Sequence, residues 1–379
     1  MLSDEYLIIY ATMLSKKFEK INDKYLTMMG EHIKRICSLS ATDIHRLDEM
    51  TILGNNINQI QSDLAKASAK TVKEMRAIYL ALALQGYAES AYIFNTLNMT
   101  QTPLSKNLAL QEYIESMVRL TQGTFQNMSN TTVLADTYQE LVDTAILEVS
   151  RGTDSFNSQM RQAIRKAGSG ARVEYASGLT RRLDSAARMN IMQGVRETYM
   201  GIRHISGEQF GYDGVELSAH ALCAIDHLPM QGKQFSLTEY EKLQSEQSSK
   251  DVNGKTYEPI RRAIGQWNCK HYVFPIKLGI SKPAYTDKQL QEYKDNSNAK
   301  IEINGREYTR YECSQLMRQA ETSMRYTKDR FILARAGGNT EEMENQRQIL
   351  NKQRKAYREL CSKAGLPKEY DRAYVHGFK

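Results

Sequence analysis

The 379-residue sequence contains no long hydrophobic run. Its longest apolar stretch, residues 77–84, is far shorter than the roughly 20 residues that a membrane-spanning helix needs. Residues 1–10 are acidic rather than basic and carry no small-residue cleavage site, so they do not resemble a secretory signal. We therefore expect a chain that contacts no membrane and resides in a cytoplasm.

Cysteine and proline are scarce as well. The five cysteines (37, 223, 269, 313 and 361) are odd in number and widely spaced, which fits reduced thiols better than a disulfide framework. Six prolines against 17 methionines favour much helix and few irregular segments. The sequence shows neither a nucleotide-binding loop nor a nucleophile elbow, and we interpret the protein as not an enzyme.

Positive charge is unevenly distributed, although no basic run exceeds two residues. Residues 1–150 hold 13 Lys and Arg against 17 Asp and Glu, a net charge of −4, so the rest carries +11 of the chain's total of +7. Interleaved charges are typical of an ordinary solvated surface, whereas the asymmetry indicates a segment that faces nucleic acid or an acidic partner. Both interpretations stay open.

Apolar residues recur at helical spacing through residues 3–149. The pattern predicts a helix from Ser3 that ends at Gly30 or at the polar cluster 38–43, a second helix capped by that cluster, and a third over residues 56–95. Pro103 marks a break, and a looser helical segment follows to about residue 149.

The next elements are a short basic helix between Gly152 and Gly168, typical of a domain entry, and a helix that Thr180 is predicted to cap. The apolar stripe of this second helix runs from Leu183 to Ile202. Four arginines lie off the stripe, at positions 182, 188, 196 and 203.

Strand patterns begin after Gly207. Asp213-Gly214 is a type I′ turn signal, and the alternation after it places His220 opposite the apolar set. Residues 268–274 are predicted to be extended, and Asn253-Gly254 and Asn304-Gly305 mark two further hairpins. The predicted sheet is small and partly antiparallel.

Residues 310–366 return to helical spacing, with Gly337–Asn339 separating the arms of an antiparallel helical hairpin and a loosely held tail after Pro367. The fold class is therefore α+β and mainly helical. We expect three parts: an N-terminal helical region (1–150), a mixed α/β core with short antiparallel strands (151–300), and a strand hairpin plus helical hairpin (301–379).

Two short segments hold five of the chain's twelve Cys and His: His220, Cys223 and His227 in the first, and Cys269 and His271 in the second. Two residues apart on an extended segment, Cys269 and His271 point the same way, and the apolar residues that follow indicate a partly buried face. Because buried imidazoles need partners, we predict that His220 or His227 contacts Cys269 or His271.

Three interpretations of this cluster remain. His220, His227, Cys269 and His271 would supply the four ligands of a closed zinc site, with Cys223 an optional neighbour. The spacing matches no standard zinc finger, so a hydrogen-bonded polar cluster that holds a small sheet is the second interpretation. The third is a thiol hydrolase with Cys269 as nucleophile and a histidine as base, for which no oxyanion-hole motif is visible.

Several short strings resemble the phage minor capsid protein 2 family, which is related to the Mu F-like head-morphogenesis proteins. Their order and spacing, from about residue 175 onward, make the resemblance specific. The strings are Thr180–Asn190, Gly207–Gly211, Asp213–His220, Asp226-His227, Gln231–Phe235, Gly265–His271 and Leu278–Ser281.

The resemblance implies a structural minor capsid protein of a tailed bacteriophage, found in the virion and, during assembly, in the host cytoplasm. It implies a role in head morphogenesis and association with the portal protein and other head proteins. The alternative is an ejection factor packaged in the head, which would hold double-stranded DNA non-specifically. For that role, Arg and Tyr recur through the C-terminal hairpin from Arg310 to Arg358 and could contact phosphates.

Overall fold

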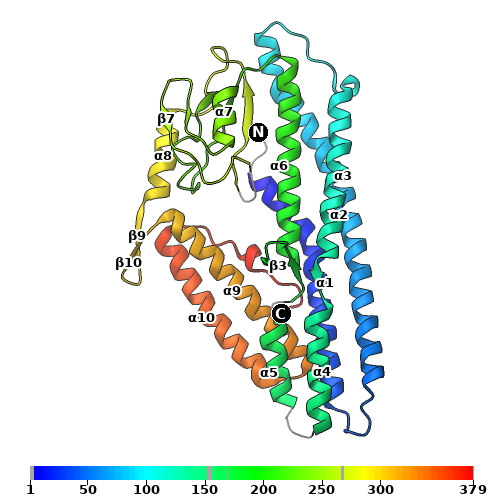
Figure 1. Ribbon diagram of the computed structural model, residues 1–379. Coiled ribbons are helices and arrows are strands. Elements are labelled where there is room, and N and C mark those ends of the chain that lie inside the picture. The colour runs from blue at the N-terminus through cyan, green and yellow to red at the C-terminus, as the bar shows by residue number, and fades with distance from the viewer. Residues whose placement is uncertain (1–3, 152–155, 169, 266–268, 379) are drawn as a thin grey trace. The chain divides into compact units, whose positions relative to one another are not determined.

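A computed structural model gives the structure of residues 4–151, 156–168, 170–265 and 269–378 (Figure 1). The chain forms two compact units: unit 1 combines Met1–Tyr10, Val72–Thr121 and Met189–Gln315, and unit 2 combines Ala11–Thr71, Gln122–Arg188 and Leu316–Lys379. The structure is mainly helical with short antiparallel strands, which confirms the predicted α+β class. The three parts expected from the sequence follow one another along the chain, whereas each compact unit combines separate segments. The three-part division stays a prediction. None of the described helices is long and apolar enough to cross a membrane.

Unit 2 is built mainly from helices. They are most of α1 (Asp4–Cys37), the first part of α2 (Arg46–Thr96), the end of α3 (Leu108–Asn130), α4 (Ala135–Arg151), α5 (Phe156–Ala167), the start of α6 (Leu183–Gln209), most of α9 (Arg310–Gly337), α10 (Thr340–Ala364) and the 3-10 turn η2 (Tyr370–Ala373). Strands β1 (Thr132–Val133), β2 (Arg172–Glu174) and β3 (Thr180–Arg182) pair antiparallel in that order. Figure 1 shows α9 and α10 side by side, as expected of the predicted helical hairpin.

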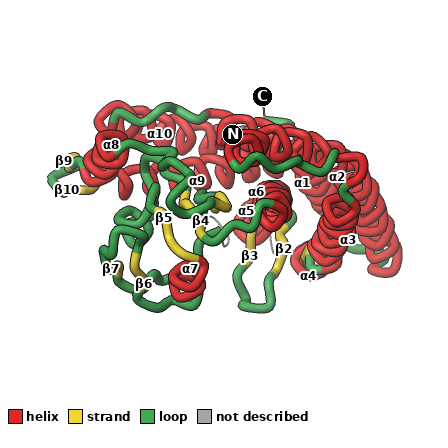
Figure 2. Tube along the Cα trace, turned by 90° about the horizontal axis from the view of Figure 1, so that it is seen from above, coloured by secondary structure: helices red, strands yellow, loops and turns green. Residues whose placement is uncertain are grey.

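Unit 1 combines the remaining parts of these helices with short strands. It also contains η1 (Leu104–Lys106), α7 (Leu237–Gln244) and α8 (Asp287–Asn298). Strand β4 (Gly214–Leu217) lies between β5 (Gln234–Ser236) and β8 (Val273–Ile276) in an antiparallel sheet. Two hairpins pair β6 (Ser249–Lys250) with β7 (Thr256–Tyr257), and β9 (Lys300–Ile303) with β10 (Arg306–Thr309). In Figure 2, α7 lies next to β6.

The core of the small sheet explains why these short strands hold together. Val215 and Leu217 of β4 are buried against Phe235, Leu243 and Tyr257. All four residues of β4 are buried, as expected for a central strand covered on both faces. The sheet is therefore a fixed support for the loops that leave its strands.

The N-terminal helices depart from the predicted boundaries. Helix α1 passes through Gly30 and ends at Cys37, so the break falls at the polar cluster 38–43. Gly30 serves close packing, because a Cβ there would lie 2.7 Å from Cβ of Ala336. The looser segment predicted up to residue 149 consists of two helices, α3 and α4, joined through β1.

The predicted helix boundary before residue 56 is wrong. Helix α2 runs without interruption from Arg46 to Thr96, through Gly54. Glycine costs only about 1 kcal/mol in a helix interior. Burial of Leu53 and Ile57 on either side outweighs that cost.

Helix α6 begins later than predicted. Thr180 does not cap it but lies in β3, opposite Glu174, and the helix starts at Leu183. The predicted apolar stripe from Leu183 to Ile202 is buried, which confirms the assignment. The arginines beside the stripe are also buried at positions 182, 196 and 203, where each pairs with a carboxylate or a carbonyl.

One predicted turn is wrong and one is confirmed. Gly214 is a residue of β4 paired with Ser236, and the left-handed position before the strand is Gly211, with φ +63°. Asn304 and Gly305, with φ of +52° and +77°, join β9 to β10 as predicted for a type I′ turn.

Two further expectations concern segment ends. Strand β8 begins at Val273, so the extended segment predicted from residue 268 starts later, and Asn268 itself lies outside the described residues. The expectation of a loose tail is wrong: Val375 is buried, and the rings of Phe378 and Phe331 lie 5.0 Å apart.

Candidate metal centre

The candidate metal centre lies in unit 1, just beyond the end of β4. The Ser218 amide donates to the Tyr272 carbonyl at 2.8 Å, and the Tyr272 amide donates to Ser218 Oγ, also at 2.8 Å. These bonds extend the pairing of β4 with β8 by one step. They hold the segment that carries Cys269 and His271 against the sheet.

His227 is placed by a compact turn in the loop between β4 and β5. Its own amide and that of Leu228 both donate to the Ala224 carbonyl at 3.0 Å. The loop closes where the Gly232 amide donates to the Leu217 carbonyl at 2.9 Å. A glycine is required at position 232, because φ is +68° and a Cβ there would lie 2.4 Å from the Leu290 side chain.

Helix α6 supports the other side of the centre. Arg196 donates through Nη1 to the Cys269 carbonyl and lies 6.0 Å from the centre of the Tyr272 ring. Tyr199, one turn further along α6, meets the Tyr272 ring edge to face at 5.5 Å. The backbone around Cys269 and His271 is therefore fixed by two contacts from a rigid helix.

Cys269 Sγ is the central atom of the cluster. It lies 3.7 Å from His227 Nδ1 and 3.4 Å from His271 Nδ1. One ligand atom from each of these three residues lies within 4.8 Å of the other two. All three side chains are buried, with exposures of 1% for His227, 3% for Cys269 and 2% for His271.

The backbone fixes the protonation of His227. Its Nε2 lies 2.9 Å from the Arg262 carbonyl, which can only accept, so Nε2 carries a proton. In the neutral ring, Nδ1 then presents its lone pair to Cys269.

Hydrogen bonding moves the pKa of Cys269 down and the pKa of His227 up. Burial raises the pKa of Cys269, but hydrogen bonds from His227 and from backbone amides outweigh it, so the pKa lies below its usual range. Burial lowers the pKa of His227, but Cys269 and the Arg262 carbonyl together raise it above the usual range. Burial and the neighbouring histidines hold the pKa of His271 well below its usual range, so this ring is neutral.

His220 and Cys223 lie at the border of the cluster. The ring centres of His220 and His271 are 4.7 Å apart, and His220 Nδ1 lies 2.9 Å from the Ala221 carbonyl. Cys223 Sγ donates to the Ala224 carbonyl at 3.0 Å, and burial together with Cys269 raises its pKa to about 12. The structure thus brings the ligand atoms of His227, Cys269 and His271 together, with the ring of His220 beside that of His271, and the predicted contact between the two segments is observed.

Burial bears on the hydrolase interpretation. A nucleophile must meet its substrate, whereas Cys269 exposes only 3% of its surface. Asp226 Oδ2 lies 3.8 Å from His227 Nε2, but that nitrogen already donates to the Arg262 carbonyl, and Asp226 accepts from the Arg261 amide at 3.2 Å. In this conformation Asp226 does not orient a catalytic histidine.

Sequence reasoning missed the supporting groups of the centre. Ser218 acts through its amide and its hydroxyl, and the Arg262 carbonyl is a backbone group that leaves no residue-type signal. Arg196 was visible only as an arginine beside the apolar stripe of its helix. Its role depends on Cys269, 73 residues away.

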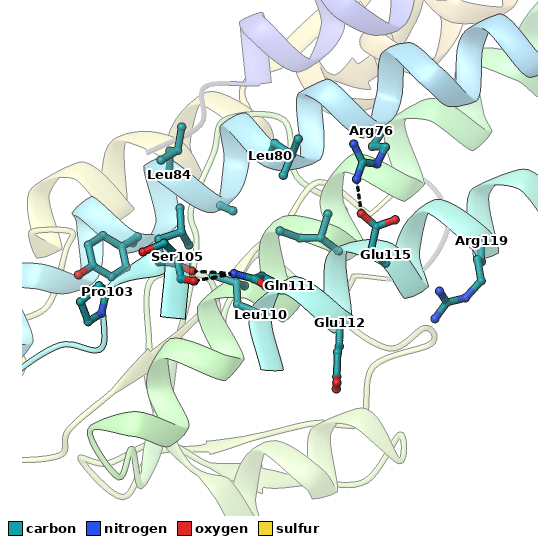
Figure 3. A pocket seen from close by; sticks show the side chains of 14 residues that line it. Arg76, Leu80, Leu84, Pro103, Ser105, Leu110, Gln111, Glu112, Glu115 and Arg119 are labelled. Atoms are coloured by element: carbon teal, nitrogen blue, oxygen red, sulfur yellow. Dashed lines mark hydrogen bonds and ion pairs between the residues drawn. The ribbon is translucent and has the colours of Figure 1, made fainter. Parts of the chain in front are cut away.

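Unit 1 also contains an apolar groove of about 990 Å³ between α2 and the segment from Pro103 into α3 (Figure 3). Leu80 and Leu84 line it and remain 44% and 62% exposed. Its charged lining residues are balanced, with two arginines and two glutamates: Arg76, Arg119, Glu112 and Glu115. An exposed apolar surface of this kind is typical of a protein contact rather than a phosphate site.

Comparison with known proteins identifies the class as a structural protein of a bacteriophage capsid. The chain belongs to the phage minor capsid protein 2 family, whose sequence model matches residues 2–362. No curated protein and no solved structure matches the chain. The match confirms the family expected from the short strings and extends it through the N-terminal helices.

Proposed function

We propose that this phage minor capsid protein acts in head morphogenesis by binding the portal protein, first in the host cytoplasm and then in the assembled head. The observation that carries the proposal is the family match over residues 2–362, which covers most of both compact units. A structural role of this kind requires a rigid scaffold and contact surfaces rather than a catalytic centre.

The apolar groove of unit 1 supports a protein partner. Its exposed leucines would be removed from water by a partner surface, and each Å² of apolar area buried contributes about 25 cal/mol. Its balanced charges give no excess of positive potential with which to attract phosphates. Both properties favour a protein over DNA at this surface.

The C-terminal helical hairpin also favours a protein partner over DNA, because several of its residues that were expected to contact DNA have partners within the chain. Arg318 pairs with Glu321 and, through two bonds of 2.8 Å, with Glu369. Tyr357 is fully buried and donates to Glu321 at 3.1 Å. These side chains stabilise unit 2 and are not available to phosphates.

The DNA-associating ejection factor remains the second candidate because of one exposed basic surface. Lys352, Lys355 and Arg358 are exposed along α10, at spacings that place them close together on the helix. Phosphate contacts made by such side chains are sequence-independent and weaken steeply with salt.

The two candidates separate in one co-purification experiment. The full chain is co-expressed with the portal protein of the same phage, captured through the portal, treated with nuclease and washed through a rising salt gradient. We expect the chain to stay with the portal after nuclease and at high salt, because apolar contacts are not screened.

The matched variant replaces the α10 surface through Lys352→Gln, Lys355→Gln and Arg358→Gln together. Under the portal proposal this variant is retained as well as the wild type. If nuclease or the triple variant releases the chain from the portal, the DNA-associating role replaces the proposal. A wild-type chain that never co-purifies with the portal also overturns it.

A further inference from the structure

We propose that His227, Cys269 and His271, with His220 as the fourth ligand, form a closed structural zinc site that fixes the sheet core of unit 1. The site is independent of the portal proposal, since a capsid protein can bind its partner with or without a metal. Histidine and cysteine together are the ligand types that zinc prefers in structural sites.

The distances agree with a common tetrahedral centre. Zinc binds sulfur at about 2.3 Å and imidazole nitrogen at about 2.0–2.1 Å, so tetrahedral angles place the two ligand atoms about 3.6 Å apart. The observed separations from Cys269 Sγ are 3.7 Å to His227 Nδ1 and 3.4 Å to His271 Nδ1. Little movement is needed to accept the ion.

Hydrogen bonding alone does not satisfy these three side chains. The sulfur of Cys269 can donate to His227 Nδ1 and accept from a protonated His271 Nδ1, so the atom left without a partner is the second ring nitrogen of His271. His271 Nε2 is buried and has no hydrogen-bond partner among the described residues. Whichever nitrogen of His271 carries the proton, a buried polar atom stays unsatisfied, and such atoms normally have a partner such as a metal ion.

The surroundings resemble a supported metal site. The Nε2–H group of His227 donates to the Arg262 carbonyl, and a hydrogen bond of this kind usually orients a zinc-bound histidine. The Arg196 contact with the Cys269 carbonyl fixes the backbone at the sulfur ligand. Burial of all three side chains excludes the competing solvent.

The choice of His220 over Cys223 as fourth ligand follows from their hydrogen bonds. His220 Nδ1 lies 2.9 Å from the Ala221 carbonyl, which leaves its Nε2 as the ring atom with the lone pair. Its ring lies 4.7 Å from that of His271 but outside the group of three whose ligand atoms lie within 4.8 Å of one another, so His220 would turn toward the ion to complete the site. Cys223 keeps its proton for the Ala224 carbonyl, whereas a zinc ligand must be a thiolate.

The test uses the full chain without an affinity tag, purified from zinc-supplemented cells. We expect elemental analysis to find about one zinc per chain, because a structural site with four protein ligands holds one ion. After chelation and addition of cobalt, we expect the intense visible bands of tetrahedral cobalt and a thiolate-to-cobalt charge-transfer band. Removal of zinc should lower the thermal midpoint, and zinc should restore it, because the folded state binds the ion more tightly.

Matched variants locate the ligands. Cys269→Ser should lose the charge-transfer band. Cys361 is a buried thiol of α10, away from the cluster in sequence, and Cys361→Ser should retain the band. His220→Gln should lose the tetrahedral spectrum. If Cys223→Ser loses it and His220→Gln does not, the assignment of His220 is overturned.

The wild type alone can refute the proposal, even if a variant fails to fold. The zinc site is excluded if the tag-free protein contains no zinc, gives no tetrahedral cobalt spectrum and shows no change in thermal midpoint with zinc. Rapid alkylation of Cys269 by iodoacetamide in the zinc-treated folded protein would also exclude it, because a metal-bound buried thiolate resists the reagent.

Discussion

Replacing Glu19 by Gln tests whether unit 2 contains a carboxyl group that is protonated in the folded state at neutral pH. Glu19 lies on α1, is 7% exposed, and its Oε2 has no hydrogen-bond partner among the described residues. Burial and then the charge of Asp184 raise its pKa from 4.5 to about 8. The other charged groups that face it are Lys16, Arg182, Arg325 and Lys328.

The sign of the pH effect follows from linkage. Glu19 binds its proton more tightly in the folded chain than in the unfolded chain, so its contribution is fully present below pH 4.5 and is lost as the pH rises through about 8. The slope is at most about 1.4 kcal/mol per pH unit, so a rise of two units removes about 2–3 kcal/mol. Asp329 adds to the same trend, because burial raises its pKa to about 7.

The assay is urea unfolding followed by circular dichroism at about pH 5.5 and pH 7.5, within the window between the unfolded and folded pKa of Glu19. We expect the wild type to lose stability at the higher pH. Glu19→Gln should reduce that loss, because Gln mimics the protonated carboxyl and does not titrate. Hydrogen exchange of peptides from α1 and α9 would assign the change to unit 2.

The exposed Glu359 of α10 supplies the control, because Glu359→Gln should leave the pH dependence unchanged. A wild type equally stable at both pH values would refute the reasoning. So would a Glu19→Gln protein that loses as much stability as the wild type when the pH rises.

Two further predictions concern buried contacts. Arg182→Met should lower the free energy of unfolding by about 3–5 kcal/mol, because it removes the guanidinium that donates to Asp184 at 2.8 Å and to Asp329 at 2.6 Å and leaves the buried carboxylate of Asp184 short of a partner. Urea unfolding would measure this, and a loss below about 1 kcal/mol would contradict it. Gly201→Ala should lower the free energy of unfolding by about 1–3 kcal/mol, measured by thermal unfolding, since its Cβ would lie 2.0 Å from the Tyr113 hydroxyl. Gly123→Ala, whose Cβ would have no atom within 4 Å, should be neutral or slightly stabilising. Equal effects of the two changes would disprove the packing account.

Local signals in the sequence were sufficient where one short segment determines the structure. The turn at Asn304-Gly305 was predictable because both residues adopt positive φ and the flanking strands pair only with each other. The stripe of α6 was predictable because burial of one helix face follows from spacing.

Prediction failed where distant residues decide the outcome. Asp213-Gly214 has the same turn signal as Asn304-Gly305, but pairing of Gly214 with Ser236 on one side and Ile276 on the other places it in a strand. Thr180 has the chemistry of a helix cap, but pairing with Glu174 determines its conformation. Such pairings depend on contacts that no local window contains.

The contact between the two segments of the candidate site was predictable, but the groups that support it were not. The Cys269-x-His271 spacing and the need of buried imidazoles for partners correctly indicated a contact with His227. The Arg262 carbonyl that sets the tautomer of His227 could not be found, since any residue type supplies a carbonyl.

The close packing of residues 370–378 in unit 2 determines when this unit can finish folding. His376 Nδ1 lies 3.2 Å from Asp23 Oδ2, so two residues separated by most of the chain meet in the same unit. A ribosome adds about 5–20 residues per second, so α1 waits on the order of tens of seconds for this partner. During that time the apolar face of α1 lacks part of its final covering. We therefore expect unit 2 to fold with better yield when its newly made helices are protected from aggregation until translation is complete.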